Sequence, residues 1–176
     1  MNNIDFCIEC ESTSIEKITE PEELDIRGDR ITVEVTYYHC KNCGVNFEDL
    51  NDDNDYLDTA YRIYRQKHNM IQPEDIKELR KKYNLTQSEL ANILGWGLVT
   101  LSRYENGSLQ DSVHDKMLKL LKEPFNLYIL LTESPNALEE KKYRELMDKL
   151  ISPGEYSLSE NLNRFLAYKY TEKLHI

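Results

Sequence analysis

The sequence predicts an α+β fold, in which a small β-hairpin head precedes an all-helical body with a helical C-terminal extension. Two observations lead to this fold class. Two Cys-x-x-Cys pairs bracket a stretch that alternates apolar and polar residues with the period of a β-strand. Residues 73–123 instead show helical periodicity, with start and stop signals at the ends of each expected helix.

The charge of the chain is divided unevenly. The 176 residues carry a formal net charge of −10, which by itself argues against a nucleic-acid-binding protein. Residues 1–60 carry −12, residues 61–123 carry +3 and residues 124–176 carry −1. We therefore expect segments with different roles. The sequence has no apolar run of about 18 residues and no secretory signal at its start, which favours a cytoplasmic protein.

The cysteines form two knuckles separated by 29 residues, and we expect them to be metal ligands: Cys7, Cys10, Cys40 and Cys43. A gap of two residues lets both sulfurs of a knuckle face one ion, and four thiolates close a tetrahedral shell. This pattern indicates a structural Zn²⁺ site without an open coordination position. Disulfide bonds would need an oxidising compartment, and a redox motif would need one pair beside a βαβ unit. His39 adjoins Cys40 and is expected to be a strand residue.

The head is expected to span residues 1–50. Between the knuckles we predict a hairpin with strands over residues 14–19 and 31–38, an irregular link through Pro21 and a turn at residues 27–30. The second strand should bury its alternating apolar residues, namely Ile31, Val33, Val35 and Tyr37. A head of this size buries little apolar surface, so we expect bound metal to supply much of its folding free energy.

Residues 51–72 are expected to link the head to the body. An acidic, turn-rich run precedes a helix predicted over residues 56–69, whose second half is basic. The sequence leaves open whether this helix is a rigid connector or faces a partner.

Residues 73–123 predict a helix-turn-helix domain. Pro73 suits the first position of a helix that buries one apolar face, and we expect Arg80 to leave that face with its neighbouring lysines. Thr86 and Glu89 form a capping box at the start of the next helix. That helix stops at Gly95, and the following helix spans residues 98–105 before an Asn-Gly stop.

The second helix of such a motif lies in the major groove of DNA. Six side chains are candidates for DNA contact: Gln87, Leu98, Val99, Thr100, Arg103 and Asn106. Arg103 can bind guanine in a bidentate manner and Val99 can contact a thymine methyl group, while Leu101 and Tyr104 face the core. Gln87 and Asn106 are placed to bind phosphates. Alternatively, Arg103 pairs within the chain, Gln87 only favours the helix, Val99 is partly buried and Leu98 belongs to the core.

Residues 124–176 predict the helical extension. An apolar run covers residues 125–131, a helix runs from Ser134 to about Leu150, and a last helix spans residues 159–173. The last helix should present Leu162, Phe165, Leu166 and Lys169 on one face. Such stripes more often form a core or a dimer seam than a ligand pocket.

Two stretches carry a family resemblance: Leu-Thr-Gln-x-Glu-Leu-Ala at residues 85–91 and Leu-Ser-Arg-Tyr-Glu-Asn-Gly at residues 101–107. They resemble the Xre/Cro-type helix-turn-helix. Together with the two knuckles, the chain resembles the MqsA/YgiT-type antitoxins over roughly residues 5–123. The family's base-reading arginine matches Arg103, whereas its base-reading asparagine falls at Val99, so the operator sequence is not carried over.

The resemblance implies the antitoxin of a type II toxin–antitoxin system, with a zinc-binding head that contacts a protein toxin. It also implies a homodimer that binds double-stranded DNA at a palindromic operator and represses its own promoter. We expect no enzymatic activity, because the sequence shows no open metal position, phosphate loop or catalytic triad. The alternatives are a plain helix-turn-helix regulator of a mobile element and a protein–protein adaptor without DNA binding.

Overall fold

The computed structural model describes residues 4–48 and 55–151, and it confirms the predicted α+β class. The described residues form three strands, β1 (Ile15–Ile26), β2 (Asp29–Cys40) and β3 (Asn46–Phe47), and seven helices, α1 (Tyr56–Lys67), α2 (Pro73–Lys82), α3 (Gln87–Leu94), α4 (Leu98–Glu105), α5 (Ser112–Leu120), α6 (Pro124–Glu133) and α7 (Glu140–Ile151). The chain divides into two compact units, Met1–Met70 and Ile71–Ile176. None of the described helices is long and apolar enough to cross a membrane.

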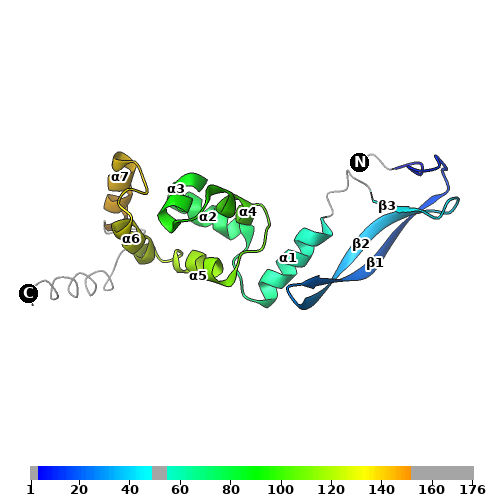
Figure 1. The fold of residues 1–176 in the computed structure, drawn as a ribbon, viewed down its shortest axis with the longest axis horizontal. Helices are drawn as coiled ribbons and strands as arrows, with labels where there is room; N and C mark the ends of the chain where they lie inside the picture. The colour runs from blue at the N-terminus through cyan, green and yellow to red at the C-terminus, as the bar shows by residue number, and fades with distance from the viewer. Residues whose placement is uncertain (1–3, 49–54, 152–176) are drawn as a thin grey trace, which may run out of the picture. The chain divides into compact units, whose positions relative to one another are not determined.

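A long antiparallel hairpin dominates the first unit (Figure 1). Strands β1 and β2 pair without interruption, from Ile15 opposite Cys40 to Ile26 opposite Asp29. The turn residues Arg27 and Gly28 have φ of 54° and 90°, which is typical of a tight hairpin turn that follows the strand twist. The predicted irregular link through Pro21 is wrong. β1 is an edge strand of the sheet, where a residue without an N–H group does not interrupt the hydrogen-bonded ladder.

The two faces of β2 pack against different partners. Ile31, Val33 and Val35 are buried, as the alternation predicts, and α1 packs on β2 within this unit. The extension of this buried face to Tyr37 is wrong, because Tyr37 is half-exposed and donates a hydrogen bond to Glu20 at 2.9 Å. Its neighbour Tyr38 is buried instead. On the opposite face at this end of β2, Tyr38 lies in a cluster with Cys7 and Cys40, and its ring stacks at 5.7 Å on Phe47 of β3, the neighbouring strand.

The linker helix α1 belongs to the first unit. Its N-cap is Asp55, whose carboxylate accepts the backbone N–H of Asp58 at 2.9 Å. Ala60 and Tyr64 are buried, and Lys67 and His68 at its other end contact the Asp29 carboxylate beside the hairpin turn. The hydrogen bond from His68, followed by that from Lys67, lowers the pKa of Asp29. One side of this helix therefore packs onto the hairpin within the first unit.

The second unit has one hydrophobic core, to which all of α2 to α7 contribute. Leu127 and Leu131 of α6 and Leu146 and Leu150 of α7 are buried in the same cluster as the apolar residues of α2, α3 and α4. The helix predicted from Ser134 starts later, at Glu140. Residues 134–137 turn instead, with Ala137 donating to the Ser134 carbonyl at 3.0 Å. The helix predicted over residues 159–173 lies outside the described residues.

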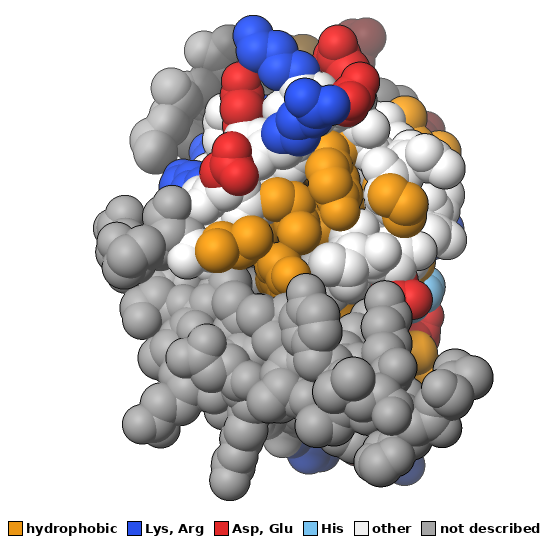
Figure 2. All heavy atoms as spheres, turned by 90° about the vertical axis from the view of Figure 1, so that its left-hand side faces the viewer, with side chains coloured by type: hydrophobic (Ala, Val, Ile, Leu, Met, Phe, Trp, Pro, Cys, Tyr) orange, Lys and Arg blue, Asp and Glu red, His pale blue; other side chains and the backbone are white. Residues whose placement is uncertain are grey.

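Helix α6 is apolar around most of its circumference. Leu127 and Leu131 are buried, whereas its other large apolar side chains are only half-buried: Phe125, Tyr128, Ile129 and Leu130. Figure 2 looks onto the α6–α7 end of the second unit and shows apolar side chains gathered beside a group of charged ones. A helix of this composition usually lies inside a core, so its half-exposed side is a candidate contact surface.

Candidate functional site

The four cysteines converge at the open end of the hairpin. Their sulfur atoms all lie within 4.8 Å of one another. Cys7 Sγ lies 3.6 Å from Cys43 Sγ, and Cys10 Sγ lies 3.6 Å from Cys40 Sγ. A Zn–S bond of about 2.3 Å in a tetrahedron gives sulfur–sulfur distances of about 3.8 Å, whereas a disulfide bond needs about 2 Å. The geometry therefore fits four ligands around one metal ion, and the four cysteines are free of disulfides.

The two knuckles have the same backbone structure. Glu11 N–H donates to the Cys7 carbonyl at 3.0 Å, and Gly44 N–H donates to the Cys40 carbonyl at 2.8 Å. One further bond closes each turn, from Cys7 N–H to Ser12 O at 2.8 Å and from Cys40 N–H to Val45 O at 2.9 Å. Glu11 and Gly44 both have positive φ, 57° and 76°. A local approximate symmetry therefore places two pairs of sulfurs around one point.

The four sulfurs affect one another's ionisation: burial and the neighbouring cysteine sulfurs raise the pKa of Cys43 to about 12, whereas hydrogen bonds favour the thiolate of Cys10. The Asn42 amide donates to Cys10 Sγ at 3.5 Å and, with a backbone hydrogen bond from Ser12, lowers the pKa of Cys10 to about 6. Glu9 N–H points at Cys7 Sγ at 3.4 Å. Several thiolates this close repel one another unless a cation lies between them, which is the chemistry of a metal site.

His39 is a residue of β2, as expected, and is separate from the sulfur cluster. Its Nδ1 atom lies 2.7 Å from Asn46 Oδ1, across the short pair of β2 and β3. This contact helps to hold β3, which covers the buried Tyr38.

The second candidate site is the helix-turn-helix formed by α3 and α4. The predicted capping box is confirmed: Glu89 N–H donates to Thr86 Oγ1 at 3.2 Å, and Thr86 N–H donates to Glu89 Oε2 at 2.7 Å. Gly95 ends α3 in the left-handed conformation, with φ of 67°. Trp96 N–H then donates to the Ala91 carbonyl at 2.8 Å and fixes the turn into α4.

Helix α4 presents the predicted outward face. Leu98 and Val99 are 54% and 69% exposed, Arg103 is exposed and Thr100 is half-exposed. Leu101 and Tyr104 are buried, as expected. The helix therefore holds a band of apolar side chains and one guanidinium on its solvent side, above a packed inner side.

The two residues predicted to bind phosphates, Gln87 and Asn106, lie outside the exposed face of α4 just described. Asn106 is exposed at the end of α4, and its amide contacts Ser102 Oγ at 3.5 Å. Gln87 is half-buried at the start of α3, and its amide donates to Glu105 Oε2 at 2.8 Å. Gln87 thus has a structural contact within the chain, at the junction of α3 and α4.

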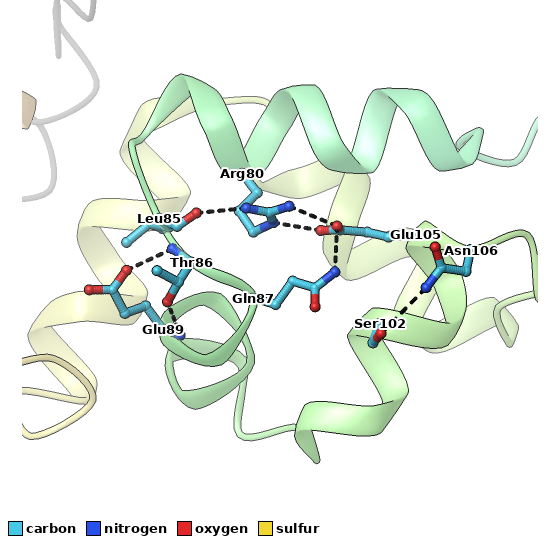
Figure 3. A network of polar contacts seen from close by, with 8 residues as sticks. All are labelled: Arg80, Leu85, Thr86, Gln87, Glu89, Ser102, Glu105 and Asn106. Carbon is cyan, nitrogen blue, oxygen red and sulfur yellow. Dashed lines mark hydrogen bonds and ion pairs between the residues drawn. The ribbon is translucent and has the colours of Figure 1, made fainter.

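A buried ion pair joins α2 and α4, and the hydrogen bond from Gln87 of α3 to the same carboxylate adds the third helix (Figure 3). Arg80 of α2 donates to Glu105 of α4 from Nε at 2.6 Å and from Nη2 at 2.8 Å. A third bond, from Nη1, reaches the Leu85 carbonyl at 3.0 Å. Glu105 is 1% exposed, and burial by itself would raise its pKa, but the bonds from Arg80 and Gln87 lower the pKa below the usual value. The expectation that Arg80 leaves the core face is wrong, because its guanidinium turns inward to this carboxylate.

An aromatic cluster supports the turn between α3 and α4. The Trp96 and His114 rings lie 4.1 Å apart with their planes tilted by 41°, and Trp96 meets Tyr104 edge to face at 6.1 Å. The Tyr104 hydroxyl lies 2.8 Å from His114 Nδ1, and Asp111 Oδ2 lies 2.9 Å from the same nitrogen. The cluster connects the turn, α4 and the start of α5, and it fixes the orientation of α4.

The sequence analysis did not predict the supporting roles of four residues: Arg80, Glu105, Trp96 and His114. For Arg80 and Glu105, the distance along the chain to a buried residue contains a signal. Arg80 follows the buried Ile76 by four residues, and Glu105 follows the buried Leu101 by four residues. Residues four apart share a helix face, so opposite charges at both positions indicate a pair facing the core. Trp96 and His114 are far apart in sequence, and no local pattern joins them.

The chain matches known proteins over most of its length. A family model described as the antitoxin component of bacterial toxin–antitoxin system, MqsA, matches residues 5–141. Antitoxin MqsA of Escherichia coli (strain K12) is 33% identical over 104 residues, which are 58% of this chain and 70% of that protein. Antitoxin PezA of Streptococcus pneumoniae serotype 4 is 43% identical over 54 residues, which are 31% of this chain and 33% of that protein.

Proposed function

Because the chain belongs to the MqsA family of antitoxin components of bacterial toxin–antitoxin systems, we propose that it is a type II antitoxin and autorepressor. Its cysteine head binds the toxin, and its helix-turn-helix binds the operator of its own promoter. The observation that carries the DNA-binding part is the solvent-exposed face of α4, with Val99 and Arg103 above a buried inner face. No catalytic step is part of this proposal.

The metal ligands of the proposed site are the four cysteines Cys7, Cys10, Cys40 and Cys43. They fit Zn²⁺, since sulfur is the only ligand type and the sulfur–sulfur distances match a tetrahedron. Four thiolates leave no position for water or substrate, so the ion would have a structural role. It would hold together two turns that have few apolar contacts of their own.

The charge of the head supports binding to a basic toxin surface. Residues 1–60 carry a net −12, whereas the rest of the chain carries +2. Complementary charge accelerates association and favours correct partners more than it adds affinity. The negative head would also be repelled by DNA phosphates. This repulsion favours toxin binding by the first unit and DNA binding by the second.

In the proposed DNA complex, α4 lies in the major groove. Arg103 reads a guanine through its guanidinium and Val99 contacts a thymine methyl group. Leu98 and Thr100 line the same face, and Asn106 at the end of α4 binds a phosphate. Gln87 contributes indirectly, since its amide holds Glu105 at the junction of the two helices.

We extend the proposal to a homodimer, in which two copies of α4 about 34 Å apart match a palindromic operator. The half-exposed apolar side of α6 supports a contact between copies (Figure 2). Replacing Ile129 by Glu should shift the protein towards monomer in sedimentation experiments and weaken operator binding. A change of the exposed Glu139 to Gln serves as control.

The DNA-binding assignment is tested with the chain's own promoter. Arg103→Ala should lose roughly 1–3 kcal/mol of specific binding free energy in gel shifts, because a bidentate base contact disappears. Arg144→Ala on α7 removes an exposed arginine away from α4 and should leave binding unchanged. Equal affinity of the Arg103→Ala variant and the unmodified chain would refute the recognition-helix assignment.

The toxin-binding assignment is tested by co-expression with the neighbouring gene. If that gene encodes a small protein that co-purifies with this chain, the antitoxin assignment is supported. If the neighbouring genes encode no toxin and the promoter is still bound, the chain is a plain regulator.

A further inference from the structure

The two cysteine knuckles share a backbone but differ in their side chains. Ile8 in the first knuckle is equivalent to Lys41 in the second, since each directly follows the first cysteine of its pair. Lys41 Nζ lies 2.6 Å from Glu16 Oε2, and the two side chains form an ordinary solvent-exposed ion pair. The second knuckle therefore forms the same turn with a polar side chain at this position.

The first knuckle exposes large apolar side chains instead. Phe6 and Ile8 flank Cys7 and are 55% and 63% exposed. The turn exposes the position after the first cysteine in both knuckles, but it does not require an apolar side chain there, as Lys41 demonstrates. Large apolar side chains exposed next to each other on a small domain mark contact surfaces.

Glu11 provides a second, independent observation. It has φ of 57°, a left-handed conformation that disfavours residues with a side chain, and its equivalent in the second knuckle is Gly44. Glycine fits this turn position better than glutamate does. Backbone strain that is retained at one of two equivalent positions points to a use for the side chain.

The surroundings of Phe6 and Ile8 are acidic. Residues 4–16 contain Asp5, Glu9, Glu11 and Glu16 and no lysine or arginine. The first three carboxylates belong to exposed residues, and only Glu16 has an ion pair to Lys41 in the described structure. An apolar centre with a charged rim is the usual anatomy of a protein-binding surface.

The first knuckle lies at the end of the hairpin that α1 leaves uncovered (Figure 1). The end of α1 contacts Asp29, at the opposite end of β2 from Cys40. Eleven residues of extended strand separate these two ends, which corresponds to about 36 Å. Within this unit, a protein bound at the knuckle would not contact the segment that leads into the second unit.

We propose that the first knuckle is the docking tip for the toxin. Phe6 and Ile8 insert into an apolar socket of that protein, and Glu9 and Glu11 pair with lysine or arginine side chains around the socket. This inference rests on the proposed antitoxin function and specifies which surface of the head performs it.

The experiment measures binding of the full chain to the product of the adjacent gene by calorimetry. Phe6→Ser and Ile8→Ser should each weaken the affinity roughly tenfold or more, as expected for anchors in a protein interface. Lys41→Ser, the matched change in the equivalent position of the second knuckle, should alter it by roughly twofold at most. Metal content of each variant, measured after purification, shows that the knuckles are intact.

Glu11→Gly separates a binding role from a structural one. It removes the strained residue and should raise the temperature at which the head unfolds, while it weakens the affinity for the same protein and reduces the dependence of binding on salt. A variant that is more stable and binds with unchanged affinity would show that Glu11 has no role in docking.

The outcomes distinguish the two levels of the proposal. If the unmodified chain does not bind the adjacent gene product, the proposed function fails. If it binds and both serine variants in the first knuckle bind equally well, the docking tip is refuted and the proposed function stands.

Discussion

Glu105 is the residue on which the arrangement of α2, α3 and α4 depends most directly. Its carboxylate is buried and accepts hydrogen bonds from Arg80 and Gln87, which belong to the other two helices (Figure 3). Arg80 and Glu105 each follow a buried residue of their own helix by four positions and so share its inward side. A buried carboxylate without its guanidinium partner is strongly unfavourable, so the pair fixes one arrangement of these helices.

Glu105→Gln should lower the free energy of unfolding of the second unit by about 3 kcal/mol, because Arg80 would remain buried without its anionic partner. Urea unfolding at pH 7, followed by Trp96 fluorescence, measures this loss. Glu139→Gln, at an exposed position, is the control and should have little effect. If Glu105→Gln and Glu139→Gln unfolded at the same urea midpoint, the stabilising role assigned to the Arg80–Glu105 pair would be contradicted.

The same carboxylate gives a pH dependence with a defined sign. The pKa of Glu105 is lower in the folded state than in the unfolded state, so its contribution to stability is present above the unfolded pKa of about 4.3. That contribution is lost as the pH falls through the lower, folded pKa. The difference between the native chain and Glu105→Gln should therefore shrink in urea titrations below about pH 4. A difference that grows on acidification would contradict this sign.

At the scale of elements, the turn between α3 and α4 decides how α4 is presented. Gly95 has φ of 67° and ends α3, whereas Gly97 has φ of −66° and precedes α4. Only the first of these glycines occupies a conformation that a side chain disfavours. The orientation of α4, and therefore of Arg103, follows from that turn and from the packing of Trp96 against Tyr104.

Gly95→Ala should destabilise the second unit by about 1 kcal/mol, because the Cβ atom of alanine makes the left-handed conformation strained. This corresponds to a fall of about 4–8 °C in the melting temperature of a domain of this size. Gly97→Ser is the matched control. It adds a side chain at an unstrained position and can cap α4, so it should leave the melting temperature equal or higher. A similar fall for both variants would contradict the assignment.

At the scale of the whole molecule, the two units are stabilised in different ways. All four cysteines belong to the first unit, whose buried cluster near the knuckles is small. The second unit has a continuous core of aliphatic and aromatic side chains contributed by six helices. Metal dependence is therefore expected of one unit and not of the other.

Removing the metal with a chelator should unfold the first unit and leave the second unit folded. The chain has one tryptophan, Trp96, which lies in the second unit and reports on that unit alone. Limited proteolysis should then cut within residues 4–48 while the Trp96 emission stays unchanged. Loss of the native Trp96 signal together with the head, or a head that stays resistant to protease, would contradict independent stabilisation.

Several features could be predicted from sequence because their causes are local. The Cys-x-x-Cys spacing, the capping box of Thr86 and Glu89, and Gly95 at the end of α3 each depend on residues within a few positions of one another. The fold class and the family follow from these signals, since they occur in a fixed order along the chain.

The sequence by itself determined the two kinds of module, the pairing of cysteines that cluster in the first unit and the exposed face of α4. The tertiary structure alone decided which polar residues turn inward, as Arg80 does, and which face of β2 is covered at each end, as Tyr37 and Tyr38 show. It also decided that α1 packs on the hairpin. The physical reason is that burial depends on what another element places above a residue, and periodicity along one element contains no information about its neighbour.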